Sequence, residues 1–189
     1  MIEERHDLLR CFGNGDPLYE RYHDEEWGLP VYGDQALLER IVLEGAQSGL
    51  SWLTILRKRE GYREAFAGFD PFVLAEFTPR DVEDLLQDTR IVRNRRKIES
   101  AITNAWATVG LRDQGTSLHE LFWSFAPEPR AEPPATWADV PAQTPESVAL
   151  AKALKKAGFV FVGPTTMYAA MQACGLVNDH IAGCVARRA

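Results

Sequence analysis

The chain has 189 residues, of which 46% are hydrophobic, so it can form one large domain or two small ones around a proper core. It has no apolar run of membrane-spanning length and no signal-peptide core near its start, which predicts a soluble cytoplasmic protein without a membrane partner. Its net charge of −6 argues against a protein that attracts nucleic acid over its whole surface.

The spacing of apolar residues predicts helices along the whole chain, and strand-like alternation is nearly absent. Start signals support several of them, among them Thr78-Pro79 and Thr144-Pro145, and Asp34 is the expected N-cap of the second helix. A proline-rich segment at 126–141 indicates an ordered surface loop or a hinge. The sequence therefore predicts an all-α fold with helices at about 16–24, 34–47, 51–60, 71–76, 79–87, 93–109, 117–125, 145–157 and 164–174.

One acidic residue lies on the apolar stripe of the second expected helix. Glu44 follows Ile41 by three residues and so shares the inward face with Leu37 and Ile41. An ionised carboxylate in a core is unfavourable unless it is paired or hydrogen-bonded. Glu44 therefore either reaches water at the edge of the stripe or lines a pocket. In the second case aromatic residues close to it in sequence would form the walls: Tyr19, Tyr22, Trp27 and Trp52.

Basic residues gather in three places on this acidic chain. Each cluster alone is most simply a solvated helix face, but together the three leave room for one basic surface. The clusters are Arg57, Lys58 and Arg59; Arg90, Arg93, Arg95, Arg96 and Lys97; and Lys152, Lys155 and Lys156.

The helix expected at 145–157 is followed by the sequence GFVFVG and a second helix that begins near Pro164. The glycines at its two ends, Gly158 and Gly163, allow the backbone to approach another molecule closely. Free amides near Thr165 at the start of the second helix suit a phosphate. An ordinary helical hairpin explains the same pattern, so both interpretations stay open here.

Two pairs of possible metal ligands lie at opposite ends of the chain. Cys11 and His23 are near the start, and His180 and Cys184 are near the end with the i, i+4 spacing of one helical face. Two cysteines and two histidines fit a tetrahedral zinc site that would join the chain ends, although two unrelated pairs explain the spacing equally well. The third cysteine, Cys174, lies in an apolar helix and is predicted to be a small core residue.

Four motifs resemble those of the DNA-3-methyladenine glycosylase I family: RCFGNGDPLYERYHDEEWG, LEGAQSGLSW, KALKKAGFVFVGPTT and MQACGLVNDHIAGC. They span residues 10–184. The resemblance implies a helix-hairpin-helix glycosylase fold formed by a single domain over 1–189, with the helix-hairpin-helix element at about 145–174 and a zinc site joining the N- and C-terminal segments. One departure is a spacer one residue shorter after Cys11, where Phe12-Gly13 stands in place of a pattern with Trp two residues after the cysteine.

The resemblance also implies roles for individual residues. Glu44 would be the catalytic pocket carboxylate, and the base would be held by Tyr22 and Trp52, with Tyr19 and Trp27 as further aromatics. Structural Zn²⁺ would be bound by Cys11, His23, His180 and Cys184. DNA would be contacted by Leu50, Gly158, Gly163, Thr165 and Lys155. Leu50, in the turn SGLS, would fill the gap left by a flipped base or serve as a plain packing residue.

The implied activity is base-excision repair by a monomer that flips 3-methyladenine out of double-stranded alkylated DNA and releases it by hydrolysis. One alternative is a non-catalytic helix-hairpin-helix DNA-binding module stapled by zinc, which would not need a carboxylate between aromatic residues. Another is a glycosylase of broader specificity that also removes 7-methylguanine or hypoxanthine. The sequence does not identify the group that activates water, and Asp179 receives no catalytic role.

Overall fold

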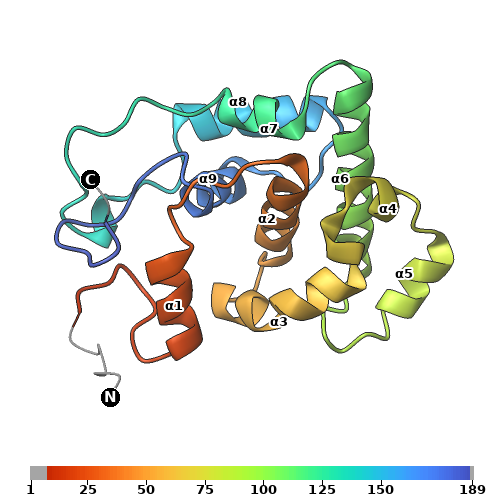
Figure 1. The fold of residues 1–189 in the computed structure, drawn as a ribbon, viewed down its shortest axis with the longest axis horizontal. Helices are drawn as coiled ribbons and strands as arrows, with labels where there is room; N and C mark the ends of the chain where they lie inside the picture. Colours follow the sequence, from red (N-terminus) through yellow and green to blue (C-terminus); the bar gives the residue numbers. More distant parts are fainter. Residues whose placement is uncertain (1–7, 188–189) are drawn as a thin grey trace.

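The computed structural model describes residues 8–187, and the regular secondary structure in that range is helical, without β-strands (Figure 1). Each predicted helix is present, so the all-α prediction is confirmed. No helix within 8–187 is long and apolar enough to cross a membrane. The elements are α1 (Pro17–Glu25), α2 (Asp34–Ala46), α3 (Trp52–Ala65), η1 (Ala67–Phe69), α4 (Pro71–Ala75), α5 (Pro79–Leu85), α6 (Arg95–Asp113), α7 (Leu118–Trp123), η2 (Trp137–Asp139), α8 (Pro145–Lys156) and α9 (Pro164–Ala173).

Two helices are longer than their sequence patterns predict. α3 continues past residue 60 through Gly61, where the lack of a side chain lets the helix pack closely against Arg90. α6 begins only after Asn94, whose side chain accepts a hydrogen bond from the backbone of Lys97 and caps the helix. It then runs four residues beyond the predicted end. Tertiary packing and capping therefore decide where these helices begin and end.

The predicted cap of α2 is wrong. Gly33 occupies the N-cap position with a φ of 85°, and Asp34 is the first helical residue. The buried carboxylate of Asp34 instead accepts hydrogen bonds from Arg112 Nε at 2.9 Å and from the backbone N–H of His119 at 3.0 Å. This side chain therefore ties the start of α2 to α6 and α7 rather than capping its own helix.

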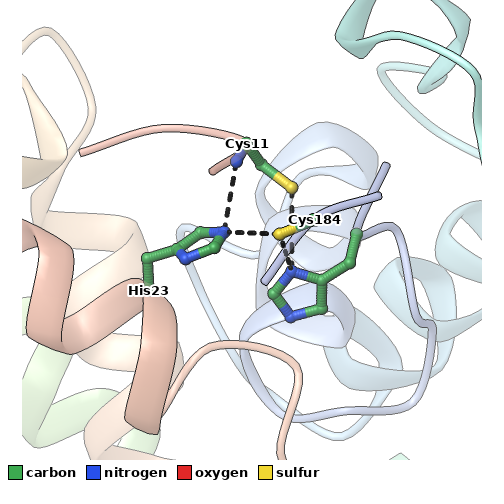
Figure 2. Close-up of side chains that lie close together, drawn as sticks. Cys11, His23 and Cys184 are labelled. Atoms are coloured by element: carbon green, nitrogen blue, oxygen red, sulfur yellow. Dashed lines mark hydrogen bonds between the residues drawn. The ribbon is translucent and has the colours of Figure 1, made fainter. Parts of the chain in front are cut away.

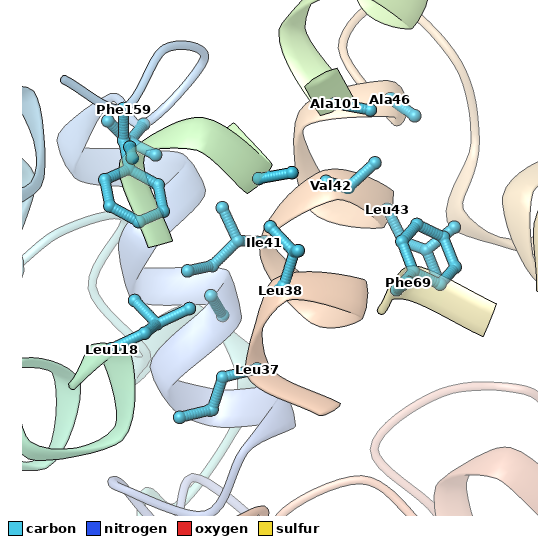
Figure 3. Close-up of a cluster of buried hydrophobic side chains, with 14 of the residues drawn as sticks. Leu37, Leu38, Ile41, Val42, Leu43, Ala46, Phe69, Ala101, Leu118 and Phe159 are labelled. Atoms are coloured by element: carbon cyan, nitrogen blue, oxygen red, sulfur yellow. The ribbon is translucent and has the colours of Figure 1, made fainter. Parts of the chain in front are cut away.

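α2 is the central helix of the fold. It contacts α3, α4, α6, α7 and α9 and is buried on nearly all sides, as expected for a helix that is apolar around most of its circumference. Figure 3 shows its side chains reaching toward Leu118 and Phe159 on one side and Phe69 on the other. Any residue placed on α2, including Glu44, is therefore held rigidly by the core.

The end of α2 and the turn after it are held by a lysine from α6. Lys97 Nζ donates to the carbonyl oxygens of Ala46 at 2.7 Å and Ser48 at 2.6 Å. A cation at a helix C-terminus satisfies carbonyls that have no partner within the helix. Lys97 therefore belongs to the scaffold and not to an open basic surface, and it positions the turn that carries Leu50.

The turn between α8 and α9 is clamped to α6 by one buried side chain. The amide of Asn104 donates to the Val160 carbonyl at 3.2 Å and accepts from the Val160 N–H at 2.8 Å. On the other side, Gly45 of α2 leaves room for Phe161, whose Cβ would lie 3.1 Å from a Cβ at position 45. The turn is thus held between α2 and α6 while Val160 stays 39% exposed.

We expect Asn104→Ala to lower the free energy of unfolding by about 1–3 kcal/mol, because the Val160 N–H and carbonyl lose their side-chain partner. Urea unfolding followed by circular dichroism measures the change. Thr103→Ala, at the exposed neighbouring position, is the matched control and should change stability by less than about 0.5 kcal/mol. Equal stability of the two variants would mean that the buried side chains of Phe159 and Val162 hold the turn alone.

Candidate active site and metal centre

The two ligand pairs predicted at opposite ends of the chain meet in one cluster. One ligand atom from each of Cys11, His23, His180 and Cys184 lies within 4.8 Å of every other, and three of the four residues are buried. Figure 2 shows Cys11, His23 and Cys184 pointing toward one another from separate segments. The alternative of two unrelated pairs is therefore wrong for this fold, and the cluster could hold a metal ion.

The spacing of the ligand atoms fits a tetrahedral centre. Cys184 Sγ lies 3.4 Å from both His23 Nε2 and His180 Nδ1, and Cys11 Sγ lies 3.6 Å from His180 Nδ1. With metal–sulfur and metal–nitrogen bonds of about 2.3 and 2.0–2.1 Å, sulfur and nitrogen ligands of a tetrahedral zinc are about 3.5 Å apart. The donor set and its geometry therefore agree with each other.

Each histidine is oriented by its other ring nitrogen. His23 Nδ1 lies 2.8 Å from Asp24 Oδ1, and Asp24 is itself held by the guanidinium of Arg10 at 2.9 Å. His180 Nε2 donates to the Trp27 carbonyl at 3.2 Å. Burial lowers the pKa of His23, and lowers that of His180 to about 4. Both imidazoles are therefore held in the neutral form that binds metals, as is usual for metal sites in proteins.

The segment that carries His180 and Cys184 is not helical, contrary to the spacing argument. It is a turn in which the Cys184 N–H donates to the Ile181 carbonyl at 3.0 Å and Gly183 has a φ of 79°. Next to it, the Val185 N–H donates to the carbonyl of Leu9 at 2.9 Å. A tight turn, and not a helical face, therefore places the two ligands side by side.

The short spacer after Cys11 is accommodated by a tight bend. Gly13 has a φ of 95°, and a Cβ there would lie 3.0 Å from the backbone of Tyr19. The Asp16 N–H donates back to the Gly13 carbonyl at 3.2 Å, and Asp16 then caps α1. The chain thus folds closely against α1, and Cys11 still reaches the cluster.

A cavity of about 440 Å³ lies directly beside the metal cluster, and Cys11 borders both. This volume is in the range of small-molecule sites. Glu44 and the four predicted aromatic residues line this one cavity, so the fold brings together residues from α1, α2, α3 and the segment after α1. The full lining is Cys11, Phe12, Tyr19, Tyr22, Trp27, Glu44, Gln47, Trp52, Trp137, Ala169 and Gln172.

Glu44 is the acidic residue of the cavity and has unusual electrostatics. Glu44 is only 5% exposed, and no residue in the 8–187 range forms a hydrogen bond with its carboxylate. Burial raises the pKa of Glu44 to about 8, and the nearby cation of Arg40 opposes this shift. Near neutral pH this carboxyl group therefore holds a proton that an incoming cation would displace.

Two aromatic rings flank the cavity from neighbouring helices. The rings of Tyr22 and Trp52 have centroids 5.4 Å apart at 45°. Trp52 is the first residue of α3, set in place by the Ser51 cap, which accepts from the Thr54 N–H. Trp27 packs edge-on against His180, with centroids 4.6 Å apart, and so links the cavity wall to the metal cluster.

Sequence reasoning missed several residues of the cavity wall. Gln172 lines the cavity and donates through Nε2 to Asp179 Oδ2 at 2.9 Å. Its side-chain carbonyl oxygen takes no part in this hydrogen bond. Asp179 is buried and also accepts from Tyr168 Oη, so it serves this network. Helical periodicity could not single these residues out, since a glutamine on a mixed face carries no distinct signal. The other missed residues are Phe12, Gln47, Ala169 and Trp137.

The residues expected to contact DNA lie on two turns and the helices beside them. Leu50 is 39% exposed, Lys155, Gly158 and Thr165 are exposed, and Gly163 is half-buried. They come from the turn after α2 and from the end of α8, its following turn and the start of α9. The structure thus leaves these predicted contact residues near the surface.

Ion pairs reduce the predicted basic surface. Arg57 binds Asp16 at 2.6 Å, Arg59 binds Glu26 and Arg95 binds Glu83, so much of the first two clusters is neutralised. The third cluster is different: its side chains are exposed and form no ion pair with the residues in the 8–187 range. It comprises Lys152, Lys155 and Lys156.

Known proteins resemble the chain over nearly all of its length. A family model for methyladenine glycosylase matches residues 12–188. The chain is 49% identical to DNA-3-methyladenine glycosylase 1 of Escherichia coli (strain K12), covering 94% of this chain and 96% of that protein. It is 46% identical to DNA-3-methyladenine glycosylase of Haemophilus influenzae, covering 93% and 96%.

Solved structures agree with the sequence matches. A crystal structure of 3-methyladenine DNA glycosylase I has a TM-score of 0.91 at 50% identity and covers 95% of this chain and 100% of that one. A structure of the Staphylococcus aureus enzyme, which concerns 3-methyladenine recognition, has a TM-score of 0.89 at 34% identity and covers 95% and 96%. The chain belongs to the methyladenine glycosylase family.

Proposed function

We propose that this chain is a DNA glycosylase that releases 3-methyladenine from alkylated double-stranded DNA by hydrolysis of the N-glycosyl bond. The observation that carries the proposal is Glu44, a buried carboxyl group without a hydrogen-bond partner in residues 8–187, placed in an aromatic cavity. A DNA-binding module would gain nothing from this arrangement, because burying an unpaired carboxyl group is unfavourable. The family relatives carry the same activity in their names.

The charge of the substrate matches the cavity. Methylation of deoxyadenosine at N3 gives the base a positive charge, which weakens the bond to the sugar. When that bond breaks, its electron pair goes to the base, which leaves neutral, and water adds to the sugar carbon and loses a proton. Cations are attracted to aromatic faces and to carboxylates, so Tyr22, Trp52 and Glu44 would select the charged base.

A base within a duplex cannot reach this cavity and must be flipped out. Leu50 is partly exposed on the turn held by Lys97, which supports the proposal that it would fill the gap in the base stack. The turn between α8 and α9 would act as the helix-hairpin-helix element, with backbone amides from Gly158 to Thr165 near phosphates. The exposed lysines at the end of α8 would add positive charge there.

The Cys/His cluster would hold structural Zn²⁺. Two thiolates and two imidazoles form a closed tetrahedral set, which leaves no open position for a reacting water. Such an ion would stabilise the single domain by fastening residues 11 and 23 to residues 180 and 184. A cytoplasmic monomer remains the predicted form.

Base release from DNAs that carry 3-methyladenine, 7-methylguanine or hypoxanthine tests the proposed activity. Release of 3-methyladenine with little of the others is the expected result. Comparable release of several bases would replace the proposal with a broader glycosylase. DNA binding without release of any base would support the non-catalytic module.

We expect one zinc per chain in protein purified without chelator, measured by plasma mass spectrometry. Cys184→Ala should lose the metal and lower the free energy of unfolding by about 3 kcal/mol or more, because a structural metal contributes directly to folding. Cys174→Ala removes a buried thiol outside the cluster and should keep the metal. Metal-free wild-type protein with normal stability would refute the zinc site.

Lys155→Ala is expected to weaken binding to all DNA sequences alike and to reduce the slope of log affinity against log salt by about 1. The reason is that a variant with one phosphate contact fewer releases about one counterion fewer when it binds DNA. Fluorescence anisotropy over a salt series measures this slope. Lys58→Ala is the control, since that ammonium group donates to the Thr89 carbonyl. The same slope in wild type and Lys155→Ala would place Lys155 outside the interface.

Glu44→Gln should reduce 3-methyladenine release by at least about tenfold, because an amide keeps the shape but cannot become anionic when the cationic base enters. Glu25→Gln, on the exposed side of α1, is the matched control and should release the base normally. Single-turnover release from alkylated DNA is the measurement. Wild-type activity in Glu44→Gln would make Glu44 a structural residue.

Melting curves across a pH series provide an independent check on the same variant. Because the folded-state pKa of Glu44 is about 8, above its unfolded value, folded wild type holds this proton more tightly than the unfolded chain. The contribution of Glu44 to the free energy of unfolding therefore falls as the pH rises from about 4.5 to 8. Glu44→Gln should lack that loss, so its melting temperature relative to wild type should increase over this interval.

A further inference from the structure

The proline-rich segment brings an aromatic residue to the cavity. Trp137, the first residue of η2, lines the same cavity as Glu44. Its ring centroid lies 6.0 Å from that of Trp27 and 6.2 Å from that of Phe12. Trp137 is nevertheless 46% exposed, so a large part of its aromatic surface is left uncovered at the edge of the cavity.

The position of Trp137 is defined by its own short helix. Thr136 donates through its backbone N–H at 2.8 Å and its hydroxyl at 2.9 Å to the same carboxylate oxygen of Asp139. These hydrogen bonds lower the pKa of Asp139, so the carboxylate stays ionised at neutral pH. One capping box, formed by Thr136 before the indole and Asp139 after it, therefore closes the single turn that presents Trp137.

The segment is also tied to the part of the chain that carries two metal ligands. The Ala182 N–H donates to the Pro134 carbonyl at 2.8 Å, between His180 and Cys184. Arg130 forms an ion pair with the buried Asp179 at 3.3 Å. Trp137 thus follows directly after a stretch that is anchored at two points.

Another cavity, of about 300 Å³, is also lined by the indole of Trp137. It is lined by Val140, Pro141 and Tyr168 among others, and it shares Trp137, Ala169 and Gln172 with the cavity that holds Glu44. The indole therefore forms part of the partition between two spaces. A tryptophan bordered by space in this way has apolar surface available to a ligand and room to adjust when one enters.

We propose that Trp137 is the outer aromatic wall of the base-binding cavity and that it covers the flipped 3-methyladenine once the base has entered. The inference rests on the proposed function. Tyr22 and Trp52 come from the helical body, whereas Trp137 comes from a segment that approaches from outside, so the base is enclosed from two directions. A flat, positively charged base gains from each aromatic face it contacts and from the exclusion of water. Trp137 is thereby a substrate-binding residue that strengthens binding, distinct from Glu44.

The test compares Trp137→Ala, Trp137→Leu and Trp137→Phe with the wild type. Binding of free 3-methyladenine by calorimetry and the KM and kcat for its release from DNA are the readouts. Trp137→Ala should weaken binding of the free base, and raise KM, by at least about fivefold, the lower bound for loss of one stacking partner. Trp137→Phe should keep most of the affinity, while Trp137→Leu, apolar but not aromatic, should behave like alanine. Trp106→Ala, at an exposed tryptophan of α6 outside the cavity, is the matched control.

The outcomes separate this inference from the proposed function. Failure of wild type to release any base would contradict the proposed function. Normal release by wild type, together with unchanged free-base affinity and KM in Trp137→Ala, would refute the proposal that Trp137 contacts the base. A loss shared equally by Trp137→Ala, Trp137→Phe and Trp106→Ala would do the same, since it would not depend on an aromatic face at this position. Melting curves of all four variants confirm that they are folded, as expected for exposed sites.

Discussion

Burial of α2 is the constraint on which the rest of the structure depends. The helix packs against α3, α4, α6, α7 and α9, and its apolar residues supply the centre of the core. Because its neighbours surround it, the carboxyl group of Glu44 cannot turn toward bulk water. The raised pKa of Glu44 follows directly from that burial. The helix that stabilises the core therefore also carries the carboxyl group proposed to select the substrate.

The cavity has a rigid inner half and an outer half made of chain segments. The inner half comes from α1, α2, α3 and α9, while the outer half comes from the N-terminal arm and the proline-rich segment. Hydrogen bonds from Val185 to Leu9 and from Ala182 to Pro134 draw both outer segments to the C-terminal turn. That turn carries His180 and Cys184 of the Cys/His cluster, so a bound metal would order the outer wall as well as join the two ends of the fold.

The two turns proposed to contact DNA are positioned by polar side chains of α6. Lys97 holds the turn that carries Leu50, and Asn104 holds the turn that carries Val160. Both residues belong to α6, seven positions apart and so on one face of that helix. A single helix therefore sets the spacing between the residue proposed to fill the base stack and the backbone proposed to bind phosphate. A lysine used in this way is unavailable to DNA, although its sequence neighbours suggested a basic patch.

Local sequence patterns determined the helices, the inward position of Glu44 and the four ligand residues, because apolar spacing and residue chemistry are readable within a few turns of chain. The sequence also predicts aromatic pocket walls around Glu44, and the resemblance to a known family adds for Tyr22 and Trp52 the proposed role of holding the base. Only the tertiary structure decided that His180 and Cys184 meet in a turn, that Asp34 bonds to other helices, and that Trp137 reaches the cavity. Each of these depends on contacts between residues far apart in the chain. Such contacts arise from the packing of whole helices, which no local period encodes.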